Sequence, residues 1–146
     1  MPGGRPPPVP AGLPRRLIRH ITVRTLIRPQ PHQGGDDAGE STATVAERVA
    51  AARARTRDRL AGTPWKTNED VPRAVLLRRF LPGKPATRAL VQHGEHLAPL
   101  RDHVHVLRLS WTLADLAGLP EPGPAQVKEA IELYRMPDEL TCREDS

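Results

Sequence analysis

Proline is distributed unevenly along this chain, and its distribution limits where a packed domain can form. The first 40 of the 146 residues contain 8 prolines and 6 glycines, whereas residues 41–146 contain 9 prolines and 5 glycines. Proline removes a backbone donor and glycine is costly to order, so the first stretch disfavours regular structure. All four aromatic residues lie beyond residue 60. We therefore expect one folded domain of about 100 residues, too short for a complete nucleotide-hydrolysing enzyme.

Composition divides the chain into four segments. Residues 1–16 are rich in proline and lack periodicity, which predicts a disordered tail. Residues 17–39 combine an isolated, β-branched strand over 17–27 with a polar linker. Residues 40–135 carry the helical patterns, and residues 136–146 are expected to form an acidic, flexible tail.

The folded part is predicted to be an all-α bundle of four to five short helices. Thr44 and Glu47 have the spacing of a capping box at the start of the first helix, and Gly62 follows its end. Gly94 falls inside the third segment, where it weakens the helix. Gly118 is expected to cap the fourth. The expected helices span about 42–60, 72–80, 86–97 and 100–117, with a fifth from Pro124 to before Pro137.

The segment 100–117 is predicted to be the central helix because apolar residues occupy more than half of its circumference. A single polar stripe interrupts them, formed by Arg101, His105, Arg108, Thr112 and Asp115. Arg101 lies in the N-terminal turn, where an arginine suits a phosphate group. Spacing alone nevertheless favours an ordinary solvated side chain.

Basic residues are concentrated in the first part of the chain. The formal net charge is +5, and residues 1–60 contain 11 basic and 5 acidic side chains against 11 and 12 in residues 61–146. A basic flank suits a nucleic acid or another phosphate partner, although charge alone favours the simpler explanation of a solvated arginine-rich helix. The possible nucleic-acid contacts lie on two flanks of the first helix: Arg48, Arg55 and Arg59 on one, Arg53 and Arg57 on the other.

Motifs for catalysis are missing from the sequence. It contains no G-x-x-x-x-G-K-[ST] loop, which predicts that this chain is not an enzyme by itself. Cys142 lies in the expected tail, and Ser110 is expected to bond to a backbone carbonyl. The histidines lack the cysteine partners and common direction of a zinc site, so no metal site is expected: His93, His96, His103 and His105.

The remaining patterns bear on location. The longest apolar runs are far shorter than the ~20 residues of a membrane span. The N-terminus has no apolar core of a signal peptide. Together with a single cysteine, these features predict a cytoplasmic protein without a membrane partner.

Three sequence blocks form a recognisable series: VAERVAAAR at 45–53, RLAGTPWKTN at 59–68 and VLRLSWTLADLAG at 106–118. In this order they resemble the C-terminal domain of the magnesium-chelatase-like AAA+ ATPases, the YifB or ComM group. The resemblance covers about residues 40–135. It implies a helical lid that follows an ATP-binding core and closes over the nucleotide.

The resemblance also implies residue roles. Arg101 matches the position of the sensor-2 arginine, which contacts the nucleotide phosphates in a complete enzyme. Arg19 is a possible remnant of an inter-subunit arginine, although the surrounding motif is not intact. This chain alone would hold no cofactor, whereas the complete family protein uses ATP and Mg²⁺. A separate AAA+ core chain is the partner that the resemblance implies.

Departures from the family pattern keep alternatives open. The ATPase core is missing, and His96 and Asp102 stand where the family usually has glycines. The chain is therefore interpreted as a lid fragment that contributes to ATP sensing only with a core supplied elsewhere. The alternatives are a small basic DNA-binding module and a non-functional remnant of a broken ATPase gene.

Overall fold

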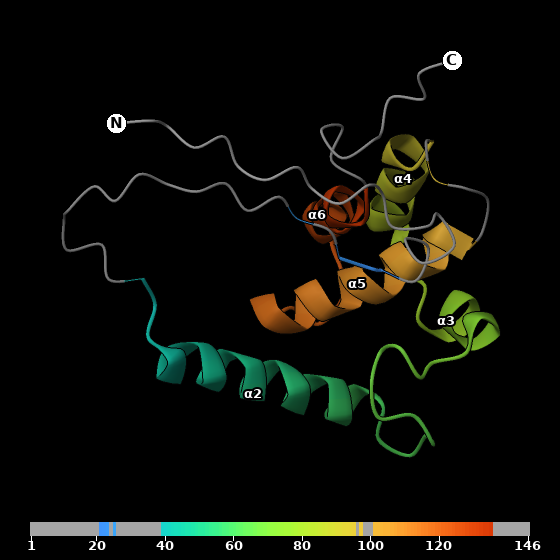
Figure 1. Ribbon diagram of the computed structural model, residues 1–146. Helices are drawn as coiled ribbons and strands as arrows, with labels where there is room; N and C mark the ends of the chain where they lie inside the picture. The colour runs from blue at the N-terminus through green and yellow to red at the C-terminus, as the bar shows by residue number, and fades with distance from the viewer. Residues whose placement is uncertain (1–20, 24, 26–38, 96, 98–100, 136–146) are drawn as a thin grey trace, which may run out of the picture.

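The computed structural model describes residues 21–23, 25, 39–95, 97 and 101–135 (Figure 1). None of these residues lies in a strand, and the expected all-α class is confirmed. The strand predicted over 17–27 is not formed by 21–23 and 25, and its other residues lie outside the described ranges. The helices of the described ranges are α2 (Thr42–Arg59), α3 (Arg73–Arg79), α4 (Lys84–His93), α5 (Arg101–Ala117) and α6 (Pro124–Tyr134). Within these ranges no helix combines the length and apolar character needed to cross a membrane.

Helix α5 lies at the centre of the arrangement. Helix α2 packs against it along one side and α6 along another, while α4 packs against α6 (Figure 1). The helices thus follow one another in space as α2, α5, α6 and α4. The prediction of a central helix over 100–117 is confirmed.

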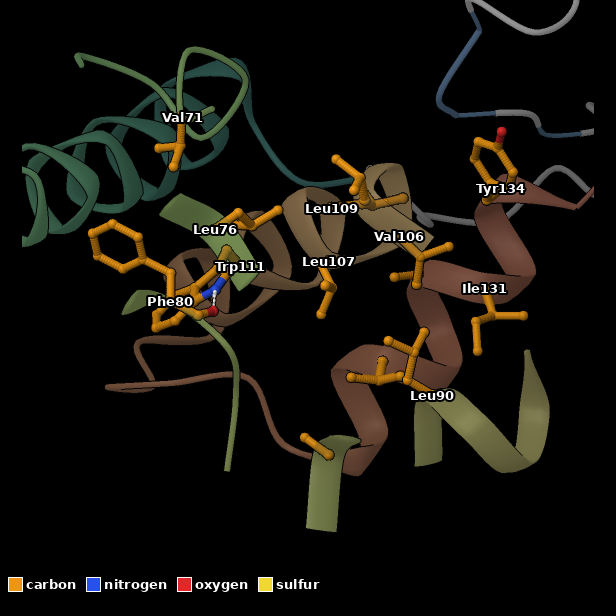
Figure 2. Packing of buried hydrophobic residues seen from close by; sticks show 14 of the residues in the cluster. Val71, Leu76, Phe80, Leu90, Val106, Leu107, Leu109, Trp111, Ile131 and Tyr134 are labelled. Carbon is orange, nitrogen blue, oxygen red and sulfur yellow. Dashed lines mark hydrogen bonds between the residues drawn. The ribbon is translucent and has the colours of Figure 1, made fainter. Parts of the chain in front are cut away.

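The apolar core is built around α5. Trp111 anchors α3, because its indole Nε1 donates a 2.8 Å hydrogen bond to the Phe80 carbonyl (Figure 2). The Phe80 and Trp111 rings meet edge to face with centroids 6.2 Å apart, a favoured aromatic geometry. In α6 the helical spacing of four apolar residues places them on one face, and each of them is buried: Val127, Ala130, Ile131 and Tyr134.

The ends of α2 and α5 follow local sequence signals, with one correction. The cap of α2 is Ser41, whose Oγ accepts a 3.1 Å bond from the Thr44 amide. The capping box predicted at Thr44 and Glu47 is therefore wrong by one turn, and Thr44 is a donor rather than the cap. Gly62 and Gly118 follow α2 and α5 with φ of 75° and 71°, values that L-residues rarely adopt.

The boundaries of α4 also differ from the prediction of 86–97. The helix begins at Lys84, because Pro85 falls in the first turn, where its missing N–H costs no helical hydrogen bond. Gly94 is the C-cap and donates its amide to the Leu90 carbonyl at 2.9 Å. The glycine thus ends the helix rather than weakening its interior.

Candidate functional site

The polar stripe predicted on α5 changes character along the helix. Arg101, its first residue, is exposed, whereas Asp115 in the last turn is only 1% exposed. The intervening His105 and Arg108 are partly buried. The stripe is therefore mostly an internal contact surface, although Arg101 at its start and Thr112 further along face solvent.

Asp115 is the centre of a buried hydrogen-bond network between α2 and α5. The Arg59 guanidinium binds both carboxylate oxygens, with Nη1–Oδ1 and Nη2–Oδ2 distances of 2.5 and 2.7 Å. The Thr56 hydroxyl donates to Oδ2 at 2.7 Å, and the Asn68 amide does so at 3.3 Å. Both carboxylate oxygens thus have partners, as a buried charge requires.

The cation of this pair is fixed on several sides. Arg59 also donates to Asn68 Oδ1 at 2.7 Å, and its guanidinium lies 4.3 Å from the centre of the Trp111 ring. One turn earlier, Arg55 donates to the Asp115 carbonyl at 2.9 Å. Together these contacts fix the C-terminal half of α2 on the C-terminal half of α5.

This network was not predicted from the sequence, although a signal for it exists. Asp115 lies in the last turn of α5, where the helix dipole disfavours a negative charge. Its neighbours on the sequence are apolar, which favours burial of this turn, although Asp115 was predicted to lie on the polar stripe. An acidic residue that is buried near the C-terminal end of a helix needs a cation from another element. Arg59 is a candidate because it lies beside the apolar positions of α2.

The opposite end of α5 presents Arg101. The adjacent acidic residue, Asp102, accepts a 2.8 Å hydrogen bond from the Tyr134 hydroxyl of α6. The Tyr134 ring in turn stacks on His105, with centroids 5.9 Å apart and planes 12° from parallel. The first turn of α5 is thus attached to α6, while the Arg101 side chain is exposed.

Arg108 connects the middle of α5 to the loop before α3. Its Nη2 donates to the Val71 carbonyl at 2.8 Å, and its Nη1 lies 3.0 Å from Glu69 Oε1. The loop before α3 is therefore held on α5 by Arg108 and, separately, by the hydrogen bonds of Asn68.

The arginines predicted as nucleic-acid contacts lie in different environments. Arg59 and Arg55 contact Asp115 as described, and Arg48 forms a two-pronged pair with Glu40 at 2.7 and 2.8 Å. The hydrogen bonds to Glu40 and its charge raise the pKa of Arg48. Arg53 and Arg57 are exposed. The structure does not bring these five side chains together as one surface.

The serine and histidine candidates do not form a catalytic or metal-binding group among the described residues. Ser110 is fully buried and donates to the Leu107 carbonyl at 2.8 Å, which confirms its predicted backbone partner. His93 is exposed, and His103 and His105 are partly buried. Among the described residues, no three or more His, Cys, Asp or Glu side chains form a group suited to a metal ion. Arg19, His96 and Cys142 lie outside the described residues.

The folded part of the chain is similar to known proteins. The model of the family described as magnesium chelatase, subunit ChlI C-terminal, matches residues 39–135. Uncharacterised proteins of Mycobacterium bovis and Mycobacterium tuberculosis are 38% identical over 96 residues, which cover 64% of this chain and 19% of each relative. The chain thus spans about a fifth of the length of these relatives. No solved structure matches the chain.

Proposed function

We propose, from the membership of this chain in the family of magnesium chelatase subunit ChlI C-terminal domains, that its bundle is the lid of a AAA+ ATPase. In this proposal Arg101 is the side chain that contacts the nucleotide phosphates. The bundle itself is not catalytic. The ATP-binding core, and the Mg²⁺ that accompanies ATP, would be supplied by another polypeptide segment of the YifB or ComM type.

One observation carries the proposal: Arg101 is an exposed cation at the first position of the central helix. Free amides at a helix N-terminus and the helix dipole both favour a negatively charged ligand there. The carboxylate next to Arg101 is bound by Tyr134, which supports a free approach of phosphate to the guanidinium. An arginine also remains charged at any physiological pH.

The buried network gives α5 a mechanical role in this proposal. Arg101 and Asp115 are separated by 14 residues, which places them about 21 Å apart along the helix axis at ~1.5 Å per residue. Because Asp115 is bound to α2, a change in the direction of α2 would be transmitted to the position of Arg101. Asp115 and Arg59 would then be positioning residues rather than ligands of the nucleotide.

The proposal is tested by mixing the full chain with a core fragment of a relative, from which the matching C-terminal segment has been removed. We expect the wild-type chain to raise the ATP hydrolysis rate of the core. With Arg101→Ala this increase should be at least tenfold smaller, which corresponds to about 1.4 kcal/mol of activation free energy. Arg73→Ala is the matched control, because Arg73 is likewise exposed at the first position of a helix, α3.

Two results would contradict the proposal. One is that the wild-type chain leaves the hydrolysis rate of the core unchanged. The other is that Arg101→Ala and Arg73→Ala stimulate the core equally, since the Arg101 charge would then have no special role.

A further inference from the structure

A groove lies between α4 and α6, two helices that pack against each other. Helix α4 contributes two neighbouring rows of side chains at i, i+4 spacing, and α6 contributes one. The first residues of both helices line this groove, and so do Gln92 and His93 in the last turn of α4. The lining residues are Lys84, Pro85, Arg88, Ala89, Gln92, His93, Pro124 and Lys128.

The charges of this groove have one sign. Lys84, Arg88 and Lys128 are exposed cations, His93 is also exposed, and no acidic residue is among the lining residues. Glu121, which is not among the lining residues, lies close to the backbone of Gly83 at the start of α4. The groove follows the whole length of α4 but only the start of α6, so the positive end of the α6 dipole adds to the field of these cations. Field lines concentrate in such a hollow and attract anions.

The surrounding chemistry narrows the class of ligand. The apolar residues that line the groove are small or ring-shaped, Pro85, Ala89 and Pro124, which offer no deep pocket for the large anchor side chain of a protein partner. Among the described residues, the aromatic side chains are buried or partly buried in the core, so none is available to stack on unpaired bases: Trp65, Phe80, Trp111 and Tyr134.

We propose that the α4–α6 groove binds the phosphate backbone of double-stranded nucleic acid, without reading its sequence. Lysine and arginine tips on exposed helical rows are suited to phosphate contacts, which set affinity but not base preference. This site differs from the α2 interface predicted from sequence, because Arg48, Arg55 and Arg59 already have partners within the chain. It also requires neither ATP nor Arg101, which lies at the end of the bundle where α4 and α6 finish.

The test uses the full chain and a fluorescently labelled 20-base-pair duplex of mixed sequence, with anisotropy measured from 50 to 200 mM salt. We expect binding whose logarithmic affinity falls linearly with the logarithm of salt concentration. Arg88→Ala combined with Lys128→Ala should weaken binding at 50 mM salt and reduce the slope by about 2, near 0.9 for each lost phosphate contact.

Two further double variants make the result specific. Arg73→Ala with Arg78→Ala removes two exposed cations of α3 and should leave the slope unchanged. Arg53→Ala with Arg57→Ala tests the α2 alternative and should also leave it unchanged. All the altered side chains are exposed, so circular dichroism should report the wild-type helix content for each variant.

The proposal fails if the duplex does not bind, or if either comparison variant lowers the slope as much as the groove variant. It also fails if a polyglutamate peptide or single-stranded DNA of the same length binds more tightly than the duplex. The former would indicate an acidic protein partner, and the latter would indicate that bases are contacted.

Discussion

At the scale of single residues, the most consequential side chain is Asp115, which is 1% exposed and binds Arg59 through both oxygens. Removing one partner of a buried ion pair leaves the other charge without compensation. We expect Asp115→Asn to lower the free energy of unfolding by about 3 kcal/mol, measured by urea unfolding followed by tryptophan fluorescence.

The matched control is Glu40→Gln, which makes the same charge deletion in an equally two-pronged pair at the surface. The side chains of Arg48 and Glu40 are 47% and 51% exposed. Water screens such a pair, so the loss should stay below about 1 kcal/mol. Equal losses for the two variants would show that burial of Asp115 adds nothing to the pair.

Asp70 should make the stability of the loop before α3 depend on pH. Hydrogen bonds from Thr67 and Lys66 lower the pKa of this exposed carboxyl below its ordinary value. A lowered folded-state pKa stabilises the fold above the unfolded pKa of about 4, and this contribution is lost as pH falls through the folded value. The difference in urea midpoint between wild type and Asp70→Asn should therefore shrink from pH 6 to pH 2.5. A difference that stays constant over this range would refute the assignment.

At the scale of elements, the start of α2 depends on Ser41. Only Ala52 of α2 is buried, so the first turns of this helix gain little from packing and depend on their cap. Losing a serine N-cap costs about 1 kcal/mol of helix stability. Ser41→Ala should therefore speed hydrogen exchange at the Thr44 amide about fivefold, measured by NMR. Thr42→Ala changes an exposed hydroxyl next to the cap and should leave this exchange rate unaltered.

Helix existence could be predicted from the sequence because apolar spacing and glycine or proline positions are local signals. The inner face of α6 and the breadth of the apolar arc on α5 follow from periodicity alone. Helix starts were less accessible: Ser41 rather than Thr44 caps α2, since several polar residues there can act as caps. The start of α4 at Lys84 depends on accepting Pro85 within the first turn.

At the scale of the whole molecule, the periodicity of the sequence does not predict which helices pack against each other. The Arg59–Asp115 pair joins residues 56 positions apart, and neither helix pattern alone identifies the other as its partner. For the same reason the groove between α4 and α6 was not predicted, because its cations are unremarkable on each helix separately. The role of Arg101 came from family resemblance and not from spacing. Its exposed position is compatible with that role, which stays a prediction until hydrolysis is measured.

The boundaries of the folded domain can be tested by truncating the chain. Among the described residues, the buried apolar side chains extend from Ala52 to Tyr134, and the family match covers 39–135. A fragment of residues 39–135 should therefore unfold with a midpoint within about 4 °C of the full chain, a difference below about 1 kcal/mol for a domain of this size. Both tryptophans lie inside the fragment and report its thermal unfolding by fluorescence.

A shorter fragment, residues 60–135, supplies the contrast because it lacks α2 and the cation that neutralises Asp115. Its midpoint should fall well below that of the 39–135 fragment, since an uncompensated buried carboxylate and an uncovered side of α5 would both act against folding. If the two fragments unfolded alike, α2 would be an appendage of the bundle and could not transmit movement to α5. The proposed coupling between α2 and Arg101 therefore depends on the same measurement as the domain boundary.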